Sequence, residues 1–261
     1  MNQTHFILVC LVCLMVSCKS DKPRQDEAKG FQNSVQQDTT KALREKPVYY
    51  RFPSAREMLT YIKTENLVYR TDLINPVEKI ENYKDTKSMA LNLGVYLADF
   101  SYMILFNKTR QSRAYFDAIV QLTSRLRISI PNEQAILSRI ADNLHNRDSL
   151  IRISETYQSD IIDYLLKTDK EKMLAVISTG SYIEGLYIAL KLVTDYSEQE
   201  NTLQKIAEQK YAFNNLLQFS KQFQEDINAK HSMQYLTPIH NKFKEFSVIE
   251  GETEVTRVDS H

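Results

Sequence analysis

The chain has 261 residues, with 33 basic and 33 acidic side chains, and its formal net charge is zero. Five glycines and six prolines are too few for an all-β sandwich or barrel with many tight turns, and they also exclude collagen-like and low-complexity proteins. The zero net charge gives no electrostatic reason to expect a nucleic acid as partner.

The first 17 residues have the features of a secretion signal. The apolar run from Phe6 to Ser17 is shorter than the roughly 20 residues that a membrane-spanning helix needs. Its length matches the apolar core of a signal peptide, which is removed from the mature protein. A buried apolar helix is the alternative for this run.

The four residues Met15-Val16-Ser17-Cys18 resemble the lipobox of bacterial lipoproteins, although methionine stands at the position where leucine is usual. The resemblance implies cleavage before Cys18 and lipidation of that cysteine. It also implies anchorage in the bacterial cell envelope, at the outer membrane. The resemblance does not decide between the periplasmic and the external face of that membrane. A signal peptide that is cut elsewhere is the alternative.

The other two cysteines, Cys10 and Cys13, would leave with the signal peptide. The mature chain would keep a single cysteine as its anchor. We therefore expect no internal disulfide, no cysteine-ligated zinc and no thiol catalysis.

Three further segments follow residues 1–17. Residues 18–46 are charged and almost free of large apolar side chains, so we expect a flexible tether. Residues 47–247 have a helical pattern and predict a single helical domain. Residues 248–261 are polar and predict a disordered tail, with a short hairpin around Gly251 as the alternative.

The helical domain is predicted to be an all-α, antiparallel bundle of about eight or nine helices. Capping-box patterns at Ser54, Thr168 and Ser197 predict helix starts, and Thr237-Pro238 predicts another. A break inside the seventh or eighth helix is compatible with the pattern. The predicted helices cover residues 54–70, 76–84, 87–107, 111–128, 132–144, 147–167, 169–194, 197–229 and 237–247.

Two segments are apolar on most faces and are expected at the centre of the bundle. Residues 88–106 carry one formal charge, Asp99, and residues 173–193 carry two, Glu184 and Lys191. Each has small residues at four-residue spacing, which lets a neighbouring helix backbone come close. These are Ala90, Gly94 and Ala98 in the first segment, and Ser181, Gly185 and Ala189 in the second.

Both segments also contain Gly-x-Tyr followed by an acid and a second tyrosine. An internal duplication of a helical unit and two independent solutions to one packing problem both explain this likeness. The phrases Leu-Asn-Leu-Gly-Val-Tyr-x-Ala-Asp and Gly-Ser-Tyr-Ile-Glu-Gly-Leu-Tyr resemble those of an uncharacterised family of Bacteroidota-type lipoproteins. That resemblance implies an all-helical fold and no particular activity.

The acids on these two segments are the candidate site, because a buried carboxylate must be paired, hydrogen-bonded or protonated. We expect two polar stripes to line one pocket for a small polar ligand. In the alternative, each carboxylate binds an arginine or a tyrosine hydroxyl and is purely structural. The stripes consist of Asn92, Tyr96 and Asp99, and of Tyr182, Glu184 and Tyr187.

No metal-binding, phosphate-loop or nucleophile motif is present, so we expect no metal, no cofactor and no catalytic residue. The first functional hypothesis is a lipid-anchored binding or scaffold protein without enzymatic activity, whose partner is an unknown protein or small molecule. The second is a small-molecule sensor or carrier with its pocket between the two apolar helices. The third is a metal-free enzyme that uses the carboxylate pair.

Overall fold

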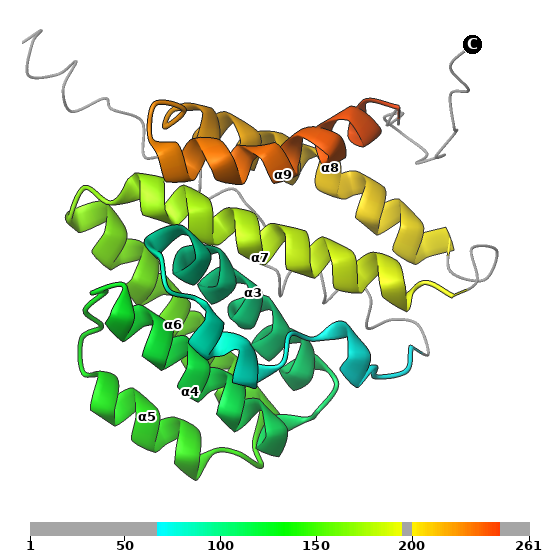
Figure 1. Ribbon diagram of the computed structural model, residues 1–261. Helices are drawn as coiled ribbons and strands as arrows, with labels where there is room; N and C mark the ends of the chain where they lie inside the picture. Colours follow the sequence, from blue (N-terminus) through cyan, green and yellow to red (C-terminus); the bar gives the residue numbers. More distant parts are fainter. Residues whose placement is uncertain (1–66, 195–199, 246–261) are drawn as a thin grey trace, which may run out of the picture. The chain divides into compact units, whose positions relative to one another are not determined.

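The computed structural model describes residues 67–194 and 200–245 (Figure 1). All of them belong to one compact unit, Pro47–His261. The described residues form seven α-helices and two 3-10 helices, with no strand among them, which confirms the predicted all-α bundle. The expected signal peptide, Cys18 and the tether lie outside the described residues, as do the helix start at Ser54 and the tail.

The described chain begins with two short 3-10 helices, and the seven α-helices follow. The elements are η3 (Thr71–Leu73), η4 (Val77–Asn82), α3 (Thr86–Leu105), α4 (Thr109–Arg125), α5 (Glu133–Asp142), α6 (Arg147–Lys167), α7 (Glu171–Leu192), α8 (Glu200–Lys221) and α9 (Ile227–Lys244).

The last part of the chain differs from the prediction. The helix predicted over residues 197–229 is broken, because Asp226 caps the start of α9 by accepting hydrogen bonds from the amides of Asn228 and Ala229. The start predicted at Thr237-Pro238 is wrong, since Pro238 lies inside α9. The Thr237 hydroxyl donates to the Met233 carbonyl, one turn earlier, and caps nothing.

Two other boundaries also differ. The helix predicted over residues 76–84 is only the 3-10 helix Val77–Asn82. The capping box predicted at Thr168 is wrong, because Thr168 ends α6 and donates its hydroxyl to the Tyr164 carbonyl. The α7 helix begins at Glu171 without a side-chain cap and is continuous to Leu192.

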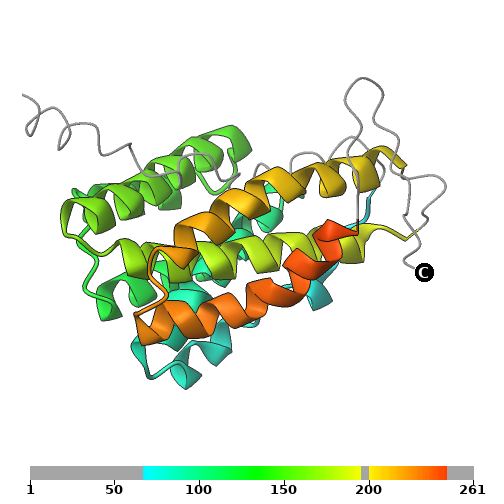
Figure 2. The ribbon, with the colours of Figure 1, turned by 90° about the horizontal axis from the view of Figure 1, so that it is seen from above.

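Helices α3 and α7 are the core helices of the bundle. Both are long and apolar enough to cross a membrane, but 72% and 61% of their most apolar windows are buried inside the protein. Helices α8 and α9 lie on one side of α7, and α3 to α6 lie on the other (Figure 1). Seen from above, α8 and α9 flank α7 along its length (Figure 2).

The two core helices run parallel and touch through their backbones at two glycines. A Cβ atom added at Gly94 would overlap the Ile177 carbonyl oxygen, and one added at Gly180 would overlap the Leu91 carbonyl oxygen. Each glycine thus lies against the carbonyl three residues before the other glycine. The predicted close approach at Gly94 is confirmed, and the backbone nitrogen of Ser181, from the second predicted stripe, lies against it; Gly180, the other glycine of the contact, is outside that stripe.

Candidate functional site

The chain just before α3 folds back over the core helices and forms one wall of a pocket. Three hydrogen bonds hold residues 70–76 on α3. They join the Arg70 amide to the Tyr102 hydroxyl (2.8 Å), the Asn75 amide to Asp99 Oδ2 (3.0 Å), and the Tyr96 hydroxyl to the Pro76 carbonyl (3.0 Å). This wall was not expected, because the sequence predicted helix over 54–70 and 76–84.

Asp99 and Glu184 meet beneath this wall. Because α3 and α7 run parallel and cross at Gly94 and Gly180, residues about one turn further along each helix come together. Asp99 is fully buried, and its Oδ1 has no conventional hydrogen-bond partner. The two carboxyl groups are within hydrogen-bonding reach of each other.

Two ionised carboxylates cannot hydrogen-bond to each other, since both only accept, so a hydrogen bond between Asp99 and Glu184 requires a proton on one of them. Burial, and next the charge of Glu184, raise the pKa of Asp99 well above its usual range. Burial also raises the pKa of Glu184 to about 7, although the hydrogen bond with Asp99 acts in the opposite direction. We place the proton on Asp99 at neutral pH because it is the more deeply buried acid.

No lysine or arginine in the described part of the chain forms an ion pair with either acid. No tyrosine hydroxyl there donates to them either, so the described residues supply no arginine or tyrosine partner of the kind that the structural alternative requires. The partner of Asp99 is instead the Asn75 backbone amide, together with Glu184. A protonated acid pair therefore takes the place of a salt bridge.

Glu184 of the pair lines an open pocket of about 520 Å³, whereas Asp99 is fully buried and does not line it. Glu184 of α7 and Asn92 and Val95 of α3 line it, and residues 71–76 with Lys79 form the opposite wall. The Asn92 side-chain nitrogen donates to the Ser88 carbonyl (2.8 Å), which leaves its side-chain oxygen available as an acceptor. The pocket therefore offers mostly hydrogen-bond acceptors at the α3–α7 side.

The six predicted site residues divide into two groups. Asn92, Asp99 and Glu184 come together, and Tyr96 supports the wall through Pro76. Tyr182 instead faces α8, where its hydroxyl donates to the Gln209 carbonyl (3.3 Å). Tyr187 is exposed on α7 and does not line this pocket. No sequence signal marked Asn75, whose contribution is a backbone amide.

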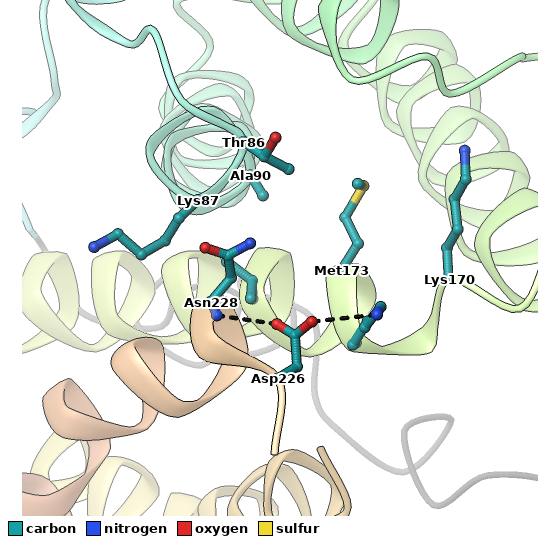
Figure 3. Close-up of a pocket in the computed structure, with 9 residues that line it drawn as sticks. Thr86, Lys87, Ala90, Lys170, Met173, Asp226 and Asn228 are labelled. Atoms are coloured by element: carbon teal, nitrogen blue, oxygen red, sulfur yellow. Dashed lines mark hydrogen bonds and ion pairs between the residues drawn. The ribbon is translucent and has the colours of Figure 1, made fainter. Parts of the chain in front are cut away.

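A second, smaller pocket of about 240 Å³ lies where α3, α7 and α9 begin (Figure 3). Helix N-termini and lysines favour anions. Here, however, Lys172 pairs with Asp226 (3.2 Å), and Lys170 donates to the Arg127 carbonyl and the Tyr164 hydroxyl (both 3.3 Å). Figure 3 shows Lys87 and Lys170 extending away from each other, so their charges do not converge on the pocket.

A third cavity is an apolar groove of about 530 Å³ between α7, α8 and α9. Leu190 lines it and is 47% exposed, and Lys242 supplies the charge at its edge. Lys242 is paired with Glu245 (3.1 Å), so the groove offers no polar group that would orient a ligand.

No protein-family model, no curated protein and no solved structure matches the chain. Within residues 67–194 and 200–245, no group of three or more histidine, cysteine, aspartate or glutamate side chains could hold a metal ion. The acid pair and its pocket are thus identified as the candidate site from their geometry alone.

Proposed function

We propose that the protein is a lipid-anchored binding protein of the bacterial cell envelope, whose helical body binds a small polar ligand between α3, α7 and residues 71–79. The observation that carries this proposal is Asp99, a fully buried acid whose Oδ1 has no hydrogen-bond partner and whose neighbour Glu184 lines an open pocket. Buried carboxyl groups without a basic partner are costly, and functional sites concentrate such groups.

The shape of the pocket favours a small molecule over a protein partner. Its volume of about 520 Å³ falls within the range of roughly 300–1,000 Å³ that is typical of small-molecule sites. It combines an acid and an amide from rigid core helices, and side chains on such helices hold a fixed geometry. Among the three functional hypotheses, the geometry therefore favours the sensor or carrier.

The lipobox-like sequence that ends in Cys18 supports the location. A lipid at Cys18 and the tether over residues 18–46 would hold the binding domain close to a membrane while leaving it in water. A protein held in this way would meet small solutes in the envelope. The sequence of the tether fits this role because it has too few apolar residues to form a core.

A ligand screen tests the proposal. Small polar compounds are added to the purified protein, and binding is followed by protein NMR shifts and by the melting temperature. We expect compounds that bind wild type to lose at least tenfold in affinity in Asn92→Ala and Glu184→Gln. The control Glu171→Gln alters an acid at the start of α7, outside the pocket, and should bind normally. Ligands that bind all four proteins equally would contradict the assigned site.

A metal-free acid–base enzyme is the second candidate, and the pKa of about 7 for Glu184 at a solvent-open pocket favours it. A group with such a pKa can both accept and release a proton near neutral pH. Incubating each ligand from the screen with the protein, and following its NMR spectrum over hours, separates the two candidates. Conversion that Glu184→Gln abolishes would identify an enzyme, and an unchanged ligand identifies a binding protein.

A further inference from the structure

We infer that the ligand of this pocket carries a positively charged ammonium group, which binds in place of the proton shared by Asp99 and Glu184. The inference rests on the proposed function and names the chemical class of its ligand. It follows from the charge of the site, from its hydrogen-bonding groups and from the unsatisfied oxygen of Asp99.

The described charged groups around the acid pair do not neutralise it, so the site can bind one cation. On the wall of residues 71–79, Asp72 is already paired with Arg70 (2.5 Å), and Lys79 is exposed at the rim. The tyrosines that face Asp99 are Tyr69, Tyr96 and Tyr115. Burial raises the pKa of all three, to about 12 for Tyr69, so they are neutral at physiological pH. Once both acids are ionised, the described residues hold no compensating charge beside them.

The hydrogen-bonding groups also match an ammonium ion. The Glu184 carboxylate and the Asn92 side-chain oxygen line the pocket as acceptors, and the buried Asp99 lies next to Glu184, while an ammonium group provides three donors and no acceptor. A hydroxyl group has a single donor to offer. A carboxylate or phosphate ligand would bring a further negative charge to the two acids.

The exchange conserves charge and protons. When the ammonium ion binds, a pair that carries one proton releases it to the solvent and a pair that carries two releases both, so the complex contains two carboxylates and one cation. Because a proton is released, the observed affinity for the amine should rise with pH until the pair has lost its proton. No covalent bond forms or breaks in this exchange.

Three probes of equal length separate the charge classes: 1,4-diaminobutane, 1,4-butanediol and succinate. Isothermal titration calorimetry at pH 6 and pH 8, in two buffers with different ionisation enthalpies, measures both affinity and the number of protons released. We expect the diamine to bind at least tenfold more tightly than the diol, to bind more tightly at pH 8, and to release more protons at pH 6 than at pH 8.

Two variants and a control keep the test decisive. Glu184→Gln, at the pocket surface, should keep the fold and lose both the affinity for the diamine and the proton release, even if Asp99→Asn unfolds. Glu171→Gln, at the start of α7 and outside the pocket, should bind the diamine as wild type does.

Failure of the inference and failure of the proposed function give different results. If the diol or succinate binds and the diamine does not, and Glu184→Gln abolishes that binding, the ammonium inference is wrong and the pocket stands. If the diamine binds wild type and Glu184→Gln equally, this pocket is not the site and both proposals are wrong. Absence of diamine binding contradicts the ammonium inference.

Discussion

Asp99 accepts a hydrogen bond from the Asn75 amide with Oδ2, its Oδ1 has no hydrogen-bond partner, and Glu184 is its acidic neighbour. At the scale of single residues, this arrangement stores a proton at neutral pH in a place where most proteins would use a salt bridge. Its consequence is a dependence of stability on pH that exposed acids do not produce.

We predict that the free energy of unfolding falls as the pH rises from 4.5 to 7. The folded pKa of Glu184, about 7, lies above its ordinary value of 4.5, so the folded chain keeps a proton that the unfolded chain has released. The stabilisation is complete below pH 4.5 and is lost as the pH rises through 7. The slope for one proton is about 1.4 kcal/mol per pH unit. Urea unfolding at a series of pH values measures it.

The variant Glu184→Gln isolates this effect. It should reduce the slope between pH 4.5 and 7 by the share of one proton, because buried Asp99 still keeps its own proton in the folded chain. Asp226, whose hydrogen bonds and partner Lys172 lower its pKa, affects stability only in more acidic solution. Equal slopes for wild type and Glu184→Gln would show that Glu184 does not hold a proton in the folded chain.

Helix geometry explains which site residues the sequence could predict. Asn92 and Asp99 are seven residues apart, close to two turns, so their shared face was predictable. Tyr182 is two residues from Glu184, which turns it about 200° away around the helix, and it therefore packs against α8. The meeting of Asp99 with Glu184 depends on the crossing of α3 and α7, which a single sequence does not reveal.

At the scale of elements, the contact of α3 with α7 depends on two glycines. We predict that Gly94→Ala and Gly180→Ala each destabilise the protein by about 3 kcal/mol or more, because backbone atoms cannot move away as a flexible side chain would. Chemical unfolding followed by circular dichroism measures the loss. Thr156→Ala, on an exposed face of α6, is the control and should change stability by less than about 0.5 kcal/mol.

The start of α9 gives a second prediction at this scale. Asp226→Ala removes the cap and should cost about 1–2 kcal/mol of unfolding free energy. Asp226→Asn keeps an acceptor for the Asn228 and Ala229 amides and loses only the ion pair with the largely exposed Lys172. Its cost in the same unfolding experiment should be below about 1 kcal/mol. Equal losses in both variants would assign the stabilisation to the ion pair.

The capping-box pattern at Thr168 did not predict a helix start correctly, because the same residues form the end of the preceding helix, α6. Thr168 and Asp169 were predicted to begin a helix. Instead Asp169 has a positive φ of 53°, and the Lys170 amide bonds the Leu165 carbonyl (2.7 Å), which closes α6. Pro238 lies inside α9 because the cap at Asp226 and the burial of Leu236 and Phe243 fix the helix around it.

At the scale of the whole molecule, the apolar pattern predicted the fold class and the two core helices. The predicted antiparallel arrangement, however, does not hold for these two helices. Helices α4, α5 and α6 lie between α3 and α7 in sequence and return the chain, so the core pair runs parallel. The stretch before α3 then covers the acid pair, and its 3-10 turns have no apolar period that a sequence would show.

The lipid anchor is tested on the full-length protein in bacterial cells. We predict that wild type incorporates labelled fatty acid and sediments with membranes, because acyl chains at Cys18 would hold it there. Cys18→Ala should lose both the label and the membrane fraction, and Cys13→Ala should keep both. Membrane association of the unlabelled Cys18→Ala protein would mean that another part of the chain binds the membrane.

The most direct measurement of the acid pair is a carbon-13 NMR titration of the Asp99 and Glu184 carboxyl groups in the intact protein. The two groups should titrate as one coupled pair, with at least one proton retained at pH 6, and 1,4-diaminobutane should displace that proton. Two independent titrations, both complete below pH 5 and unchanged by the diamine, would contradict the shared proton and the ammonium site.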